Sequence, residues 1–319
     1  MKEILATIDA LIQQEVFPGC EFAVIDGAPF SSEVRRFCLG NRQILPHEKP
    51  LEPGLWWDLA SLTKVIGAGT ACIDLWLSGN LDIDAPLKSL YPAWHEETVT
   101  IRALLTHTSG IDPFIKNRNQ MTARELTKAM NQLSVSLDKT FNYSDVNFIL
   151  LGFMLEVQFH QSVADIINAR IFEKWALTGL GYGPIAADKA VPTATDVPAG
   201  VVHDPKARVL GTHCGSAGLF GTLSALTEFV RHYLADENYL QLYAQLTDGR
   251  PLAWATRGDG KWLCHTGYTG TFILLNLQTK QAVIFLSNRV HLKDARADWI
   301  LKRDALIEQF ITFFAHEKK

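Results

Sequence analysis

Apolar residues near the N-terminus recur every three or four positions over residues 2–16, which predicts an amphipathic helix. Pro18-Gly19 ends this pattern. Residues 20–25 and 33–40 have strand-like composition and spacing, and they predict two strands joined by a turn at residues 26–29. The chain therefore begins with one helix and the first strands of a sheet.

The C-terminal third shows a similar mixture of patterns. Residues 223–234 and 238–247 predict helices. Residues 271–278 and 281–288 predict a β-hairpin, because two apolar runs are separated only by Thr279-Lys280. A long helical pattern over residues 294–315 then predicts a closing helix.

The middle of the chain has few strand patterns. Helices are predicted at residues 62–78, 100–107, 122–133, 144–158 and 162–175, and a long loop at the Gly-, Pro-, Ala- and Asp-rich residues 178–205. Because strands lie at both ends and helices between them, we expect an α+β fold, in which an antiparallel sheet is flanked by terminal helices and carries an inserted all-α subdomain. Residues 1–319 would form a single unit, with residues 1–80 and 206–319 in the α/β sandwich and residues 81–205 in the mainly helical insertion.

Composition excludes several classes of protein. Of the 319 residues, 47% are hydrophobic, which is enough for a large core and excludes a disordered chain. The net charge of −4 is unsuited to a phosphate backbone, so we expect no nucleic-acid partner. The longest apolar run, residues 148–155, is far shorter than the about 20 residues of a membrane span. Acidic residues interrupt residues 1–15, so no signal peptide is evident and a cytoplasmic location is expected.

The common metal and nucleotide motifs are missing from the sequence. The five cysteines are scattered and form no C-x-x-C pair, and no H-E-x-x-H occurs, so we expect neither a metal nor a disulfide framework. The glycine-rich residues 179–183 do not complete a dinucleotide fingerprint, because Pro184 follows. No G-x-S-x-G nucleophile motif is present. No cofactor is predicted.

The pattern S-x-x-K occurs twice, and its two copies differ in setting. Ser136 and Lys139 lie in a polar stretch, whereas Ser61 and Lys64 lie at the start of an apolar helix. Residues three apart share one helix face, so the Lys64 ammonium can reach the Ser61 hydroxyl. The structural interpretation is a helix-capping serine with a lysine whose aliphatic stem packs on the protein surface. The chemical interpretation is a serine nucleophile activated by a neighbouring lysine.

Two further segments favour the chemical interpretation. Tyr143 opens the helix predicted at 144–158, where it can act as an acid or base beside a lysine. The segment His265-Thr266-Gly267 lies on a strand that we expect at the edge of the sheet. Its glycine permits close backbone approach, and the N–H that follows can stabilise an oxyanion.

Taken in order, Ser61-x-x-Lys64, Tyr143-Ser144-Asp145 and His265-Thr266-Gly267 resemble the motifs of the penicillin-recognising serine hydrolases. That family includes class C β-lactamases, D-alanyl-D-alanine carboxypeptidases and related esterases. Further similar segments, at residues 104–110, 202–204, 215–222, 266–270 and 288–291, extend the resemblance over most of the chain. The resemblance implies an α/β sandwich, an all-α subdomain and a catalytic serine between them, in agreement with the layout predicted above.

The resemblance also implies a role for each matching residue. Ser61 would be the nucleophile, Lys64 the neighbouring base and Tyr143 the proton relay to the leaving group. His265, Thr266 and Gly267 would hold the acyl side or the carboxylate of a small-molecule or short-peptide substrate. The backbone N–H groups of Ser61 and Tyr268 would form the oxyanion hole. The implied reaction is acyl transfer through a covalent acyl-enzyme, followed by hydrolysis.

Two positions depart from class C β-lactamases. Asp145 replaces an asparagine, so a substrate-binding amide donor becomes an acceptor. Its carboxylate would also keep Lys64 protonated, which favours Tyr143 as the base. His265 replaces a lysine and carries less positive charge at pH 7. Both departures favour a carboxypeptidase or esterase, with weak β-lactamase activity.

Several alternatives remain open from the sequence. The chain could be a non-catalytic ligand- or penicillin-binding protein that has kept the cleft. His107 is expected to be structural, and Cys264 to face the core on the opposite side of its strand from His265. The roles of His203 and Asp204, the physiological substrate and the oligomeric state are not predicted.

Overall fold

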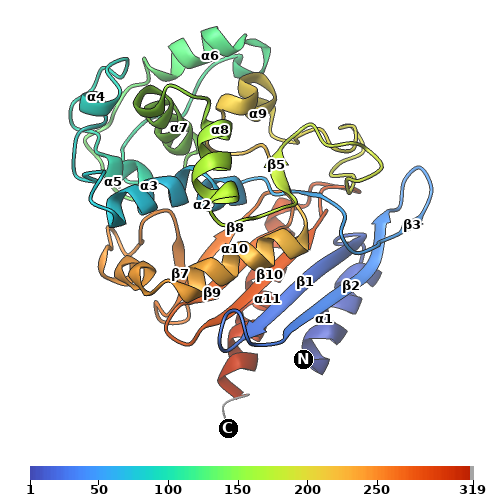
Figure 1. Cartoon of the computed structure of the whole chain (residues 1–319). Coiled ribbons are helices and arrows are strands. Elements are labelled where there is room, and N and C mark those ends of the chain that lie inside the picture. Colours follow the sequence, from blue (N-terminus) through green and yellow to red (C-terminus); the bar gives the residue numbers. More distant parts are fainter. Residues whose placement is uncertain (317–319) are drawn as a thin grey trace.

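A seven-stranded antiparallel sheet forms the base of the protein, in the order β3-β2-β1-β10-β9-β8-β7 (Figure 1). The structure, a computed structural model, describes residues 1–316. The strands are β1 (Gly19–Asp26), β2 (Val34–Gln43), β3 (Lys49–Pro50), β7 (Ala255–Arg257), β8 (Trp262–Thr266), β9 (Phe272–Asn276) and β10 (Gln281–Ser287). Both ends of the chain contribute, since β1 pairs with β10 from Cys20↔Ser287 to Asp26↔Gln281.

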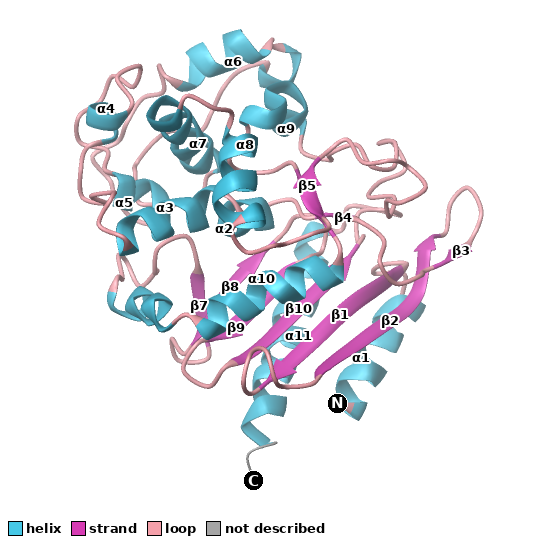
Figure 2. Cartoon of the chain, viewed as in Figure 1, coloured by secondary structure: helices cyan, strands magenta, loops and turns pink. Residues whose placement is uncertain are grey.

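Alternation along the central strands separates two hydrophobic layers. In β1, Phe22 and Val24 pack with the layer that contains the terminal helices, whereas Ala23 and Ile25 join the layer beneath the remaining helices. Helices α1 (Lys2–Gln13) and α11 (Arg296–His316) cover the first face, and α10 (Leu223–Ala235) crosses the second (Figure 2). This arrangement confirms the predicted α+β class with an antiparallel sheet flanked by terminal helices.

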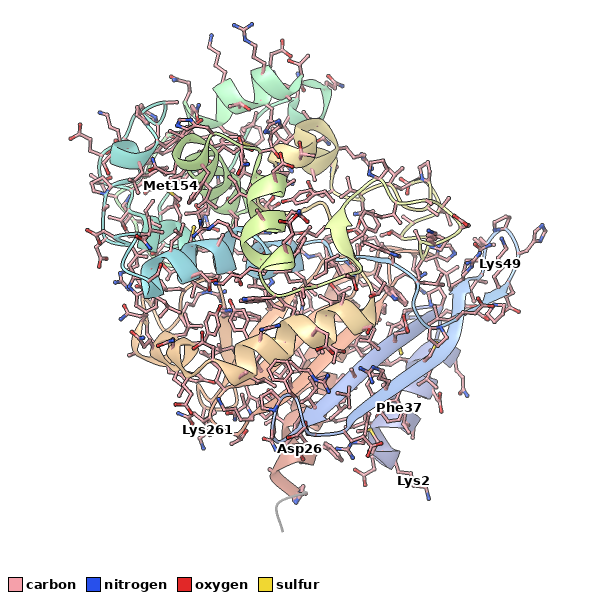
Figure 3. All side chains as sticks on the ribbon, in the orientation of Figure 1. Lys2, Asp26, Phe37, Lys49, Met154 and Lys261 are labelled. Atoms are coloured by element: carbon pink, nitrogen blue, oxygen red, sulfur yellow. The ribbon has the colours of Figure 1, made fainter. Side chains whose placement is uncertain are left out.

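Most of the other helices gather above the second face of the sheet (Figure 1). They are α2 (Leu62–Ile66), α3 (Ala68–Leu77), α4 (Leu87–Leu90), α5 (Ile101–Leu105), α6 (Ala123–Met130), α7 (Asp145–Phe159), α8 (Val163–Ile167) and α9 (Pro205–Leu210). Short 3-10 turns lie at Arg118–Gln120, Gly211–His213 and Glu237–Ala244. In Figure 3, Met154 lies among these helices, far from Phe37 on the sheet. The division of the chain at residues 81 and 205 stays a prediction.

Four elements differ from the predicted ones. The helix expected over 62–78 is broken at Gly67, whose ψ of −107° leaves the helical range. A Cβ at Gly67 would lie 2.7 Å from Ile167 Cδ1, so close packing against α8 holds the break. The helix expected over 162–175 continues as a π-helix at Asn168–Glu173, and the one at 238–247 is a 3-10 helix.

The fourth difference lies in the predicted loop over 178–205. It contains the short strand β5 (Leu180–Tyr182), which pairs with β6 (Leu219–Gly221). Strand β6 also pairs with β4 (Trp57–Asp58), directly before the first S-x-x-K motif. This small sheet therefore ties the long loop to the segment that carries Ser61. Within residues 1–316, no helix has both the length and the apolar character that a membrane crossing requires.

Candidate active site

Ser61 lies immediately before α2, at the end of a tight turn. The preceding residue, Ala60, has a φ of +46°, which is uncommon for a residue with a side chain. The buried carboxylate of Asp58 stabilises this turn, because its Oδ1 accepts the Ala60 N–H at 2.9 Å. The turn directs the chain from β4 into α2 and sets the position of Ser61.

Lys64 is fully buried, and its ammonium has three hydrogen-bond acceptors. Nζ lies 2.9 Å from Ser61 Oγ, 2.8 Å from Asp145 Oδ1 and 3.1 Å from the Ser216 carbonyl oxygen. Burial alone would lower the pKa of Lys64, but the Asp145 carboxylate and the Tyr143 side chain outweigh it and raise that pKa above its ordinary value. The lysine is therefore charged at neutral pH.

Asp145 is the first residue of α7 and lies between two lysines. Ser144 caps the helix by accepting the Val146 N–H. The Asp145 carboxylate binds Lys64 through Oδ1 and Lys206 through Oδ2, the latter at 3.0 Å. Burial raises the pKa of Asp145, but the two ammonium groups lower it more, so its net shift is downward and the carboxylate stays ionised.

Tyr143 is 41% exposed, and its ring lies over the Lys64 ammonium, with 5.1 Å between Nζ and the ring centroid. His107 positions this tyrosine from beneath, at 4.5 Å between ring centroids. The Nδ1 atom of His107 accepts the Ser144 N–H at 3.2 Å and faces the Asn147 amide at 3.0 Å, while its carbonyl oxygen accepts the Asn142 N–H. Both His107 and Asn147 therefore hold the loop that carries Tyr143.

The segment His265-Thr266-Gly267 closes the other side of the site. Its strand is not the edge strand that we expected, because the short β7 pairs with residues 262–264 of β8. That pairing ends at Cys264, so His265 and Thr266 extend beyond β7 while they still pair with β9. Cys264 lies in the core beneath the terminal helices, on the face expected for it.

His265 is only 4% exposed, and its ring lies 6.3 Å from the Tyr143 ring. Neither of its ring nitrogens has a hydrogen-bond partner among residues 1–316. Burial, followed by the charge of Lys64, places the pKa of His265 well below its usual range, so the ring is neutral. A buried polar ring without a partner is uncommon, and this makes His265 a candidate for a substrate contact.

Gly267 brings the end of β8 against the nucleophile turn. A Cβ at this position would lie 2.1 Å from Thr271 Oγ1 and 2.9 Å from the Leu59 carbonyl oxygen. The neighbouring turn is also tied to that segment, because Thr269 donates its hydroxyl to the Asp58 carbonyl oxygen at 2.8 Å. Ser61 and the 266–268 segment are therefore held close together.

Tyr268 and Thr266 contact different parts of the protein. The Tyr268 ring stacks on His203, with 5.6 Å between centroids, and its hydroxyl donates to Asp294. The Thr266 hydroxyl faces α11, where its oxygen accepts a hydrogen bond from Arg303 at 3.3 Å. A role for the Thr266 side chain in binding substrate stays a prediction.

The loop before α9 contributes residues that the sequence left unassigned. The backbone N–H of His203 donates to Asp58 Oδ2 at 2.7 Å, and Asp204 caps α9 and binds Lys206. Lys206 was not singled out from the sequence. Its one local signal is its place two residues after Asp204, and nothing in the sequence connects it with Asp145.

The second S-x-x-K copy forms no comparable site. Ser136 is exposed, and Lys139 donates instead to the Ser109 carbonyl oxygen at 2.7 Å. Across the described part of the chain, no group of three or more His, Cys, Asp or Glu side chains is placed to hold a metal ion. The chemistry available at Ser61 is that of a hydroxyl, a charged lysine, a tyrosine and backbone donors.

The antiparallel sheet, the helical layer and a serine–lysine pair between them are features of the β-lactamase fold and its serine hydrolases. The family model described as Beta-lactamase matches residues 6–307, so the chain belongs to the Beta-lactamase family. This membership confirms the resemblance drawn from the motifs and makes a serine hydrolase the broad class of the protein.

Individual relatives are distant. A Salmonella enteritidis PT4 protein named "Putative D-alanyl-D-alanine carboxypeptidase" is 23% identical over 314 residues, covering 78% of this chain and 72% of its own. A class C β-lactamase from Rhodobacter sphaeroides has a TM-score of 0.74 at 17% identity, over 98% of this chain and 100% of its own. EstCE1, described as a hydrolase with promiscuous acyltransferase activity, has a TM-score of 0.75 at 16% identity, over 96% of this chain and 97% of its own. These two structures show a shared fold.

Proposed function

We propose that the protein is a serine hydrolase that acts through a covalent acyl-enzyme on an ester, an amide or a D-amino-acid peptide. The observation that carries this proposal is the 2.9 Å contact between Ser61 Oγ and the fully buried Lys64 ammonium. A buried lysine is costly unless it is paired, and here one of its three partners is a hydroxyl at the start of a helix. The names of the relatives, which include a carboxypeptidase and a hydrolase, agree with the proposal.

In the proposed reaction, Ser61 Oγ attacks the substrate carbonyl carbon and forms a tetrahedral oxyanion. Tyr143 acts as a relay: its hydroxyl accepts the serine proton while its own proton passes to the leaving group, whose bond to the carbonyl carbon breaks. Because Asp145 keeps Lys64 charged, Lys64 supports this step as a cation. The N–H groups of Ser61 and Tyr268 are the proposed oxyanion donors. Water then attacks the acyl-enzyme and releases the acid and Ser61.

The remaining site residues are proposed to orient the substrate. His265 is neutral and unpaired within the described residues, so it can hydrogen-bond a substrate oxygen or nitrogen. Thr266 and Gly267 would align the acyl or carboxylate side along the end of β8 that extends beyond β7. Asp145 can accept a hydrogen bond from the substrate, because 28% of its side chain remains exposed.

Covalent labelling tests the proposal directly. A fluorescent fluorophosphonate should label the wild-type protein at a single serine, and Ser61→Ala should abolish both labelling and ester hydrolysis. Ser136→Ala is the matched control, since it removes the serine of the second S-x-x-K copy, and it should leave both signals unchanged. A wild-type protein that binds penicillin or ester without any Ser61-dependent adduct would instead be the non-catalytic binding protein.

A further inference from the structure

A line of four alternating charges runs from the nucleophile to the loop before α9. Its members in order are Lys64, Asp145, Lys206 and Asp204. The contacts measure 2.8 Å from Lys64 to Asp145, 3.0 Å from Asp145 to Lys206, and 2.9 Å from Lys206 to Asp204. These ion pairs join α2, α7 and α9, with Asp204 at the N-cap of α9.

Lys206 is almost as enclosed as Lys64. Its side chain is 9% exposed, compared with 22% for Asp204 and 28% for Asp145. Burial alone would lower the pKa of Lys206, but Asp145 and Asp204 raise it, so the ammonium stays charged. A lysine buried at this depth is stable only with its carboxylates in place, and the same ion pairs restrain those carboxylates.

We propose that Lys206 is a positioning residue that holds Asp145 in the orientation in which its other oxygen binds Lys64. This inference rests on the proposed function, because Lys64 matters only as the partner of Ser61. With Lys206 present, each lysine binds one oxygen of Asp145, and the two ion pairs together restrain the carboxylate while part of its side chain stays exposed. Without Lys206, Asp145 would lose one of its two anchors and its negative charge would act on Lys64 alone.

The charged and titratable groups around this line come from every adjoining element. They include Lys64 of α2, Tyr143 before α7, Asp145 of α7, Asp204 before α9, Asp58 of β4, Cys214 before β6, His107 after α5, His265 of β8, and Arg250, whose charge acts on both histidines. Both histidines are neutral, because burial lowers the pKa of each. Loss of the Lys206 cation therefore leaves Lys64 charged, so the substitution acts on the orientation of Asp145 rather than on the charge of Lys64.

A double-mutant cycle between Lys206 and Asp145 tests the inference. Lys206→Met should slow Ser61-dependent labelling by about tenfold or more, while Lys206→Arg should retain most of the rate. In an Asp145→Asn background, Lys206→Met should change the rate less than about twofold, because its partner is already gone. Lys174→Met is the matched control, since Lys174 pairs with Asp74 outside the site, and its rate should match the wild type.

Two results would overturn the inference: an equal loss in both backgrounds, or no loss in the Lys206→Met single variant. Failure of the proposed function gives a different result: the wild-type protein would then show no labelling that depends on Ser61. Urea unfolding of the wild type, Lys206→Met, Asp145→Asn and the double variant needs no activity and tests the placement of Lys206. A coupling free energy between the two positions supports the placement, and additive changes contradict it.

Discussion

The Lys64 ammonium lies as close to Asp145, at 2.8 Å, as it does to Ser61, at 2.9 Å. A lysine that removes a proton from serine must itself be neutral, and the carboxylate opposes that state. The raised pKa of Lys64 therefore favours a cationic role for it and supports Tyr143 as the proposed proton carrier. The Tyr143 ring covers the same ammonium at 5.1 Å, so the three side chains form one electrostatic unit with Ser61.

Removal of the Lys64 or the Tyr143 side chain should slow acylation of Ser61. Tyr143→Phe should lower the rate of Ser61 labelling by about 10²–10⁴-fold, the usual contribution of a positioned proton-transfer group. Lys64→Ala should cause a loss of similar size, because it removes the cation beside Ser61 and Tyr143. The double variant should lose little more than the worse single variant, because groups that act together are non-additive. Stopped-flow or gel-based labelling rates measure this, and multiplied losses would show that the two residues act independently.

Gly267 should tolerate no side chain. Gly267→Ala should place a methyl group 2.9 Å from the Leu59 carbonyl oxygen and closer still to Thr271, and so displace the end of β8 from Ser61. We expect destabilisation by about 1–3 kcal/mol and a larger loss of labelling than of folded protein. Urea unfolding and labelling of the same sample measure both effects.

Gly181→Ala is the control for that substitution. Its new Cβ would approach only Trp56, at 4.0 Å, so its free energy of unfolding should change by less than about 0.5 kcal/mol. Full labelling by Gly267→Ala would mean that the end of β8 does not need to approach the nucleophile turn.

Sequence patterns predicted the Ser61–Lys64 pair because both residues lie on one helical turn, where spacing alone sets their proximity. Asp145 was expected near Lys64 from the motif resemblance. Lys206 was not expected, since its contact with Asp145 joins two helices that only tertiary packing brings together. The break at Gly67 was missed for a related reason. The helical pattern is continuous there, and the space that a side chain would need is occupied by Ile167, which lies in α8, far away in the sequence.

Burial of Asp58 should make stability depend on pH in an unusual direction. Burial raises its pKa from 3.8 to about 6, against the hydrogen bonds from His203 and Ala60 that lower it. The folded state therefore holds this proton more tightly than the unfolded state, and stability falls as pH rises from about 4 to about 6. The contribution of this group is on the order of 3 kcal/mol.

Comparison with Asp58→Asn isolates that contribution. Between about pH 4 and pH 6, the wild type should lose stability relative to the variant in urea unfolding. The comparison of wild type with Asp84→Asn should show a small effect of opposite sign. Arg102 lowers the pKa of this exposed carboxyl, so the wild type should lose stability relative to Asp84→Asn as pH falls. A difference between wild type and Asp58→Asn that is constant over this range would show that Asp58 keeps an ordinary pKa.

Aryl esters and penicillins should differ as substrates of this site. We expect p-nitrophenyl esters of short acids to be hydrolysed measurably and benzylpenicillin poorly. An activated ester needs only Ser61 and the oxyanion donors. A penicillin also presents a side-chain carbonyl, which would meet an acceptor at Asp145 at a cost of about 1–3 kcal/mol, and a carboxylate, which would meet the neutral His265.

Values of kcat/KM for both substrates at pH 7 measure this preference, and Asp145→Asn tests its cause. The variant replaces the acceptor with an amide donor and removes the carboxylate from Lys64, so penicillin turnover should rise relative to ester turnover. Its Lys206 keeps Asp204 as a partner at 2.9 Å, which favours a folded variant. Wild-type turnover of penicillin above that of the ester would contradict the prediction, and so would a fall in penicillin hydrolysis in Asp145→Asn, since either result would place the recognition of the β-lactam on a residue other than Asp145.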